Sequence, residues 1–284
     1  LLYAISRQKS TICCDRAFNN KQFLFFFILA LLIFLVAIFA PFIVTKNPYD
    51  AIMTESLLPP SSKYLFGTDR LGRDIFSRII YGTRPSLLMT FSLIVIVFVT
   101  GTFLGVISGY FGGKIDSIIM RLADMMMSFP GLVLAIAVAG ILGPNMVNSV
   151  LAVALVTWPK YARLARSLVL KTKKNNYIEV AIVGGAKTSK LLLKYFLPNI
   201  ITTMIVTATT DIGAMMLELA SLSFLGFGAQ APTPEWGLML NEGRTYISKA
   251  PWLILYPGLA IVFVVVVFNM LGDTVRDILD TKNN

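Results

Sequence analysis

The sequence predicts an all-α membrane protein with six transmembrane helices. Hydrophobic residues make up 56% of the 284-residue chain and charged residues only 14%, whereas a soluble domain is about one quarter charged. The hydrophobic residues fall in blocks of roughly 20, the length that a helix needs to cross about 30 Å of hydrocarbon. A lipid bilayer is therefore the expected surrounding of most of the chain.

Six hydrophobic blocks are expected to span the bilayer. The first follows a basic stretch and is too long for the apolar part of a signal peptide, so we expect it to be a retained anchor. The six blocks cover residues 23–44, 87–110, 118–142, 147–168, 200–225 and 252–271. The last five form a core over 87–272, and residues 1–22 and 273–284 are the expected terminal tails.

The distribution of basic residues predicts the orientation. Residues 160–194 hold nine lysines and arginines against one acid, Glu179. A basic loop beside apolar spans is typical of the cytoplasmic side, and this distribution argues against nucleic acid as the reason for the net charge of +10. Because this loop joins the fourth and fifth spans, both termini are expected to be cytoplasmic.

Residues 45–86 form the long segment expected outside the cytoplasm. Their six basic and four acidic residues nearly balance. Around Asp74, apolar residues recur at helical spacing, with Arg73 and Ser77 on the opposite face. This pattern favours an amphipathic helix that lies on the outer membrane surface or caps the translocation path, and a helix that only packs against the spans is an equal alternative.

The second span contains a stripe of glycines at four-residue intervals. They are Gly101, Gly105, Gly109 and Gly113. In lipid, such a stripe lets another helix approach closely, because small residues bring the two backbones into contact. We interpret it as a helix-packing feature.

No catalytic apparatus is visible in the sequence. The nearest match to a P-loop, at Gly113 and Lys114, fails because Ser108 stands where the first glycine is needed and Ile115 follows the lysine. The chain has no histidine, which rules out a histidine-based catalytic triad or metal site. We expect no bound cofactor or metal, so energy for uphill transport would have to come from elsewhere.

Four charged residues within the spans are candidates for pore-lining or interhelix roles, since an ionisable group in hydrocarbon usually faces the bundle interior. Asp211 and Glu218 lie seven residues apart and are expected on one face of the fifth span. Pore lining and bonding between helices remain equal alternatives for them. Arg121 and Asp124, three residues apart in the third span, are expected to pair with each other.

The cytoplasmic segment 177–199 has the character of a docking element. The pattern of residues 177–186 predicts a short helix that is too short to span and too polar for lipid. One face of this helix is apolar and is the expected docking face, formed by Ile178, Ala181, Ile182 and Gly185. Gly185 and Ala186 remove side-chain bulk, so a partner could approach closely. A second amphipathic stretch follows, and Pro198 stands near the first turn of the fifth span, where proline is tolerated.

This segment resembles the "EAA" loop of ABC importer permeases. The residues that match the loop are Glu179, Val180, Ala181, Gly185, Ala186, Leu197 and Pro198. Val180 replaces the usual second alanine, and Tyr195 stands where many relatives have histidine. Neither change adds a charge. The resemblance implies that a coupling loop over residues 169–199 connects the pore to an ATPase.

Four further stretches resemble hallmarks of the dipeptide, oligopeptide and nickel branch of this family. They are residues 66–78, 218–226, 232–237 and 271–277. The resemblance implies the type I importer permease fold with a cytoplasmic coupling helix in the bacterial inner membrane. It also implies a second homologous permease, two cytoplasmic ATPases that hold ATP and Mg, and an extracytoplasmic solute-binding protein.

External residues would then contact the solute-binding protein. The candidates are Asp69, Arg70, Arg73, Asp74, Glu235 and Trp236. A transporter or channel driven by an ion gradient is the alternative function, but it would need carboxylate relays or inverted repeats, which are not visible. An assembly factor without transport activity would not explain the docking loop. The substrate stays open among dipeptides, longer peptides, nickel and metal chelates.

Overall fold

The computed structural model describes residues 20–279, and the regular elements among them are helices. The predicted tail 1–22 lies almost wholly outside the described residues, as do residues 280–284 of the C-terminal tail. The longer helices are α2 (Lys21–Ile43), α3 (Ile75–Phe111), α4 (Gly113–Met127), α5 (Gly131–Leu142), α6 (Met146–Lys173), α7 (Asn176–Val183), α9 (Leu197–Thr210), α10 (Ile212–Phe224), α11 (Trp236–Gly243) and α12 (Trp252–Leu279). The short elements are η1 (Met53–Glu55), α8 (Thr188–Lys190), η2 (Leu191–Phe196) and η3 (Arg244–Tyr246).

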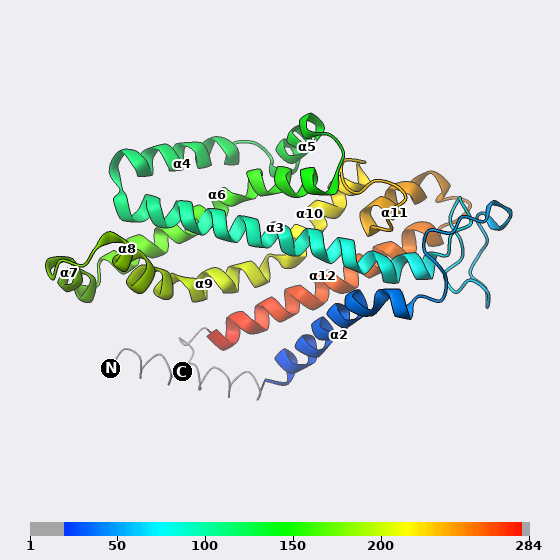
Figure 1. Ribbon diagram of the computed structural model, residues 1–284, viewed down its shortest axis with the longest axis horizontal. Coiled ribbons are helices and arrows are strands. Elements are labelled where there is room, and N and C mark those ends of the chain that lie inside the picture. The colour runs from blue at the N-terminus through cyan, green and yellow to red at the C-terminus, as the bar shows by residue number, and fades with distance from the viewer. Residues whose placement is uncertain (1–19, 280–284) are drawn as a thin grey trace.

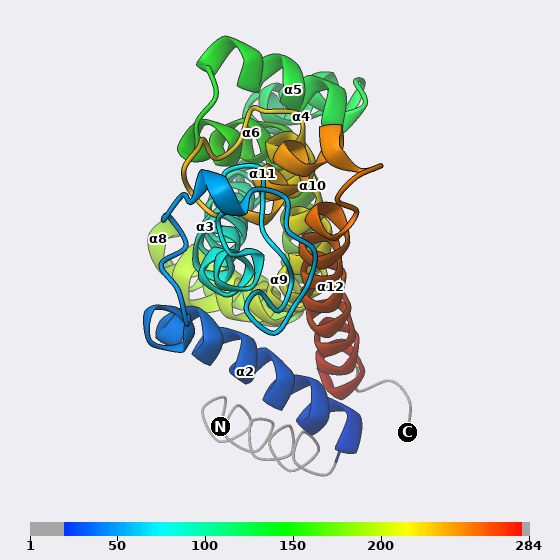
Figure 2. The same ribbon diagram turned by 90° about the vertical axis from the view of Figure 1, so that its right-hand side faces the viewer.

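The helices form an elongated bundle with two distinct ends (Figure 1). One end carries α7 and α8, and the starting end of α2 and the final turns of α12 point toward it. The opposite end carries α11 and the long connection between α2 and α3. Figure 2 looks at this second end, where that connection loops in front of α3. The segments predicted as cytoplasmic and external therefore lie at opposite ends.

The closest helix packing joins α3 to α6. Cβ atoms added at Gly101, Gly105 or Gly109 would lie within 3.0 Å of α6 atoms, and at Gly105 the nearest is the Ala162 carbonyl oxygen at 2.3 Å. These three glycines therefore let the two backbones touch, as predicted. Gly113 is different, because it starts α4 and a Cβ there would meet nothing within 4 Å.

Aromatic side chains join α2 and α12 to the edge of α3. The Phe34 ring lies 5.1 Å from that of Phe91 and 6.0 Å from that of Phe268, measured between centroids. Phe91 and Phe268 also contact each other edge to face at 5.7 Å. Such aromatic pairs add to the stabilisation from burial. The anchor helix is thus part of the bundle rather than a separate tether.

Four helical stretches in the described part of the chain are long and apolar enough to cross a membrane: α2, α3, residues 188–210 and α12. The predicted third span is not one straight helix, because α4 and α5 are bent by 94° at the break around Pro130. The predicted fifth span is interrupted at Asp211, between α9 and α10. The sixth continues to Leu279, so the expected tail is helical over 273–279.

Of the two alternatives for the residues around Asp74, the structure supports a helix that packs within the protein and not a separate helix on the outer membrane surface. Those residues are the first turns of α3, which has 37 residues and is about 55 Å long, far more than a bilayer needs. Arg73, Asp74 and Ser77, which lie opposite the apolar positions in the sequence pattern, are each at most 5% exposed. The apolar periodicity was real, but both faces of this turn are covered by other parts of the external end.

Candidate functional site

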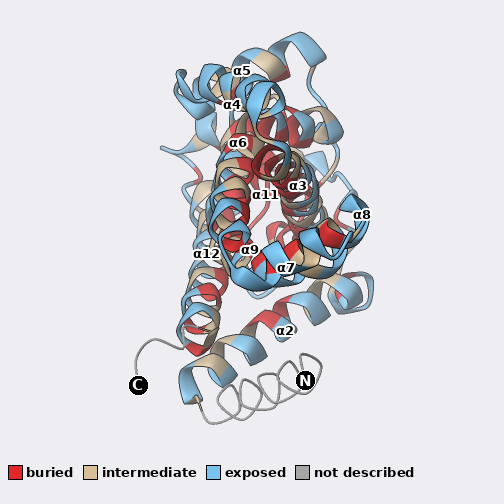
Figure 3. Cartoon of the chain, turned by 90° about the vertical axis from the view of Figure 1, so that its left-hand side faces the viewer, coloured by how far each residue is buried: buried red, intermediate tan, exposed pale blue. Residues whose placement is uncertain are grey.

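Helix α7 stands at one end of the bundle and is exposed over much of its surface (Figure 3). It follows α6 after a short turn, in which the Asn175 N–H donates to the Thr172 carbonyl at 3.1 Å. Ile178 is completely buried and anchors the helix where α7 lies against α6 and η2. The helix is therefore attached through the buried Ile178 side chain to α6 before it and η2 after it in the sequence.

The exposed face of α7 differs from the predicted docking face. The prediction placed Ile178 on that face, but the protein itself covers this residue. Tyr177, Val180 and Val183 are exposed instead, with Val180 at 72% and Val183 at 89%. Three exposed apolar side chains on so short a helix are unusual for a surface that meets only water. This α7 face is the best candidate for a protein contact at this end.

Gly185 is needed for the backbone that ends α7. The Gly184 N–H donates to the Val180 carbonyl at 2.9 Å. The Ala186 N–H donates to the Ala181 carbonyl at 3.1 Å. Gly185 between them has φ of +72°, and a Cβ there would meet nothing within 4 Å. This is a Schellman C-cap, so glycine is required here by backbone conformation rather than by close approach of a neighbour.

The remaining residues of the predicted coupling loop lie on both sides of this turn. Glu179 is exposed in the first turn of α7, and Ala186 packs partly against the core. Leu197 begins α9, and its N–H bonds to the Leu192 carbonyl, closing a π-helical turn. This π-helical turn interrupts the α-helical hydrogen-bonding pattern just before Pro198, a residue that has no backbone N–H to donate. Residues 188–210 therefore continue as one helical stretch through the proline.

The structure brings Asp211 together with basic and phenolic groups of α6. Both Asp211 carboxylate oxygens accept from the Lys160 Nζ, at 2.6 and 2.7 Å. The Tyr161 hydroxyl donates to the same carboxylate at 3.1 Å. Asp211 is thus an interhelix residue that ties the α9–α10 junction to α6. Glu218 does not share this contact and is exposed on α10.

The predicted pair of Arg121 with Asp124 is wrong. Asp124 forms its ion pair with Arg163 of α6. One turn farther along α6, Arg166 binds the Asp116 carboxylate through two bonds of 2.6 Å. Two acids of α4 are therefore paired with two arginines of α6.

From the sequence alone, the basic residues of α6 indicated only which side of the membrane is cytoplasmic. Lys160, Arg163 and Arg166 each bond to an acid from another helix. Their spacing of three residues was a signal for one helix surface. The same three residues thus contribute to the positive-inside pattern and form ion pairs between helices, so one role does not exclude the other.

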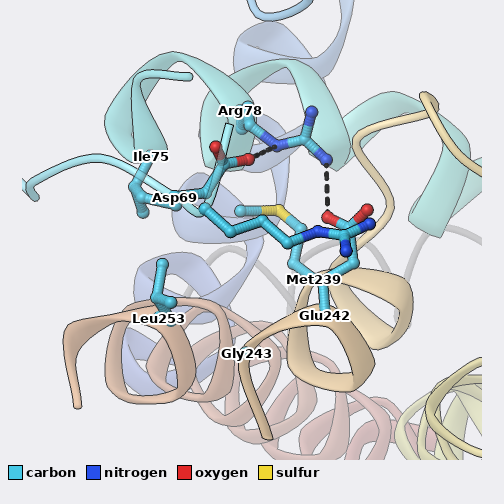
Figure 4. Close-up of a pocket in the computed structure, with 8 residues that line it drawn as sticks. Asp69, Ile75, Arg78, Met239, Glu242, Gly243 and Leu253 are labelled. Atoms are coloured by element: carbon cyan, nitrogen blue, oxygen red, sulfur yellow. Dashed lines mark hydrogen bonds and ion pairs between the residues drawn. The ribbon is translucent and has the colours of Figure 1, made fainter. Parts of the chain in front are cut away.

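At the opposite end of the bundle, four charged side chains meet below the surface, and Figure 4 shows three of them, Asp69, Arg78 and Glu242. Arg73 bonds to Asp69 at 2.5 Å and to Glu242 of α11 at 2.9 Å. Arg78 lies 3.3 Å from Glu242 and 3.8 Å from Asp69. The arginine side chains are at most 2% exposed. We call these four residues the external charge cluster, and it joins the segment before α3, α3 itself and α11.

Most candidate contacts for a solute-binding protein are buried. Asp69, Arg73 and Asp74 lie within or beside the external charge cluster, and Arg70 is the exposed exception. Glu235 and Trp236 are also buried, at 3% and 2% exposure. The Trp236 indole N–H donates to the Ile79 carbonyl at 3.0 Å. These side chains therefore shape the external end, and a direct contact stays a prediction for Arg70.

Glu235 caps α11 from inside the protein. Its carboxylate oxygens accept from the Gly237 and Leu238 N–H groups, both at 2.9 Å, and the Ser86 hydroxyl lies at 3.3 Å. Burial raises the pKa of the Glu235 carboxyl above its ordinary value, although these hydrogen bonds oppose the rise. The folded protein therefore holds the proton on Glu235 more tightly than the unfolded chain does.

We expect Glu235→Gln to change how stability depends on pH. A carboxyl whose folded pKa is raised costs stability as pH increases from the unfolded value through the folded one. The difference in melting temperature between Glu235→Gln and the parent protein should therefore grow between about pH 4 and neutral pH, in favour of the variant. Thermal unfolding in detergent measures it, and a difference that does not change with pH would contradict the burial argument.

These features define a helical membrane protein with an exposed apolar helix at one end and a rigid, charge-linked cap at the other. Residues 101–284 match the family described as "Binding-protein-dependent transport system inner membrane component". The chain belongs to this family, and it is a transport subunit of the permease type.

Three relatives illustrate the family membership. The chain is 45% identical to the dipeptide transport system permease protein DppC of Alkalihalophilus pseudofirmus, over 87% of this chain and 82% of the relative. It is 44% identical to DppC of Haemophilus influenzae, over 93% and 92% of the two chains. It is 38% identical to the nickel transport system permease protein NikC of Escherichia coli, over 89% and 91%.

Solved structures agree on the fold. The inward-facing MetNI methionine ABC transporter contains a chain that matches with a TM-score of 0.59 at 19% identity, covering 72% of this chain and 97% of that one. An amino acid ABC transporter matches with a TM-score of 0.53 at 16% identity, covering 71% and 94%. The predicted permease fold is confirmed.

Proposed function

We propose that this chain forms half of the translocation pore of an ATP-driven importer in the bacterial inner membrane. A second homologous permease would complete the pore, two cytoplasmic ATPase subunits would bind ATP and Mg, and a solute-binding protein would deliver the cargo from outside. The family membership supports this over a transporter or channel driven by an ion gradient. Both termini would be cytoplasmic, on the side of α7.

The observation that carries the proposal is the exposed apolar face of α7 on a helix that is too short to span a membrane and stands at one end of the bundle. An ATPase groove would cover Tyr177, Val180 and Val183, with Glu179 at the edge. Because Ile178 is buried between α6 and η2, a force on α7 would pass directly into those helices. Closing of the ATPase dimer would then switch the pore by rigid-body movement, provided that α7 docks differently in the two states.

The cargo would be a short peptide, nickel or a metal chelate. Relatives carry names for dipeptide, glutathione and nickel transport, and the three share this permease architecture. In such a system the external binding protein would do most of the selecting. The exposed Arg70, at the rim of the external charge cluster, is the residue that we assign to contact with it.

The test uses Gly185 variants of the complete complex in vesicles. Gly185→Val should lower both ATP-dependent uptake and stimulated ATP hydrolysis several-fold, because a β-branched residue is strained at φ of +72°. Gly185→Asn is the matched control, since asparagine tolerates this conformation, and it should retain most of both activities. Normal uptake by Gly185→Val would refute the coupling role, and vesicles without the ATPase subunits should show no uptake.

A further inference from the structure

Glu218 is a charged residue whose role the contacts within this chain do not explain. The side chain lies in α10, two turns beyond Asp211, within the predicted fifth span. It forms no hydrogen bond or ion pair with any residue that the structure describes, and it is exposed at the surface of the chain. An ionised group in a membrane span is costly and usually faces the bundle interior or a water-filled cavity.

The charges near Glu218 leave one negative charge without a counterpart. Lys160 of α6 and Asp211 at the α9–α10 junction are the charged groups that act on Glu218, and the Tyr161 hydroxyl donates to Asp211. The Lys160 ammonium is held by both oxygens of Asp211, at 2.6 and 2.7 Å. When Glu218 is ionised, one cation and two carboxylates sum to a net charge of −1, so the described part of the chain supplies no second cation to pair with it.

The space in front of Glu218 is a small cleft formed by three helices of this chain. Its walls are α5, α6 and α10, and every lining residue other than Glu218 is uncharged. Gly131, Ala135 and Thr157 among them have small side chains, which leave room beside the carboxylate. The cleft is therefore apolar with a single negative group, so its charge would favour a positively charged group over a neutral or anionic one.

Building on the proposed function, we propose that Glu218 lines the translocation path and binds a cationic group of the transported solute. The group would be an ammonium, as at the amino end of a peptide, or a divalent metal ion. Both chemistries place a positive charge against a carboxylate that has no internal partner. A basic side chain of the second permease is the rival occupant, and the experiment below distinguishes it.

The experiment measures charge selection in the cleft of the assembled complex, without relying on uptake. Leu132, which lines the cleft and is 43% exposed, is replaced by cysteine in a chain whose Cys13 and Cys14 are serine. We expect a cationic methanethiosulfonate (ethyltrimethylammonium) to react with this cysteine faster than the anionic ethylsulfonate reagent. Glu218→Gln should reduce the ratio of the two rates by about ten-fold.

Solute protection identifies the source of the cation. Millimolar alanyl-alanine should slow labelling of the Leu132→Cys protein if the site takes an ammonium, and nickel chloride should do so if it takes a metal. Protection should be lost in Glu218→Gln and retained in Glu218→Asp. An unchanged rate ratio, or a lack of protection by either probe, would overturn the proposal. A cysteine that reacts in the isolated permease but not in the assembled complex would also overturn it, because the second permease would then occupy the site. ATP hydrolysis by the same complexes tests the proposed function separately.

Discussion

Arg78→Ala should destabilise the folded protein by about 3–5 kcal/mol, the cost of removing one partner from a buried set of charges. Arg78 is completely buried and faces Glu242 and Asp69 at 3.3 and 3.8 Å. Its guanidinium also donates to the Pro48 and Pro232 carbonyl oxygens, at 3.2 and 3.4 Å. Removing it would leave two buried carboxylates with Arg73 alone and two carbonyls without a donor.

Thermal unfolding of the purified protein in detergent measures this loss. Arg70→Ala is the matched control, because Arg70 is an exposed arginine of the same segment and its removal should change stability by about 0.5 kcal/mol or less. Arg78→Lys should fall between the two, since lysine keeps the charge but not the planar fork of donors. Equal melting temperatures for Arg78→Ala and Arg70→Ala would show that the external charge cluster does not hold this end together.

Gly105→Val should prevent close packing of α3 on α6. A Cβ at this position would lie 2.3 Å from the Ala162 carbonyl oxygen and 2.7 Å from the Ala165 Cβ, so the helices would have to separate. Overpacking a core costs about 1–3 kcal/mol, and here the obstacle is backbone that cannot change rotamer, so the loss should reach or exceed the top of that range. The variant should be recovered from membranes in lower amount and unfold at lower temperature.

The control is Gly140→Ala in α5. An added Cβ there would approach only the Phe227 ring, at 3.7 Å, which is ordinary van der Waals contact. In a helix interior, alanine is favoured over glycine by about 1 kcal/mol, so this variant should be as stable as the parent or slightly more so. If Gly105→Val behaves like Gly140→Ala, the glycine stripe does not determine the α3–α6 distance.

Much of the fold could be predicted because hydrophobic blocks, a glycine stripe and loop motifs are local features of the sequence. The glycines at 101, 105 and 109 were correctly assigned to helix packing. The length of α3 was not predicted, since its first turns contain charged residues that a hydropathy argument places outside a span. One of them, Arg78, is buried beside Glu242, a partner far away in sequence, and single-segment periodicity does not report such contacts.

In the candidate sites, too, some features follow from the local sequence and others depend on tertiary packing. The position of the α7 loop followed from its motif, but its exposed face did not, because whether Ile178 or Val183 points outward depends on how the loop folds back onto α6 and η2. The pairing of Asp124 with Arg163 rather than Arg121 also depends on how α4 lies along α6. Sequence spacing identifies which charges share a helix, and tertiary packing decides which of them meet.

The docking of α7 on an ATPase subunit is the claim on which the transport mechanism depends, and site-directed crosslinking tests it most directly. Val183→Cys, at a position that is 89% exposed, would be made in a complex whose permease has serine at positions 13 and 14. Met53→Cys, 65% exposed at the opposite end of the bundle, is the control. We predict that a short thiol crosslinker joins residue 183 to an ATPase subunit, with a yield that changes on ATP binding, and that residue 53 gives no such product. An intact complex in which residue 183 stays unlinked in every nucleotide state, or in which residue 53 links to the ATPase, would contradict the account.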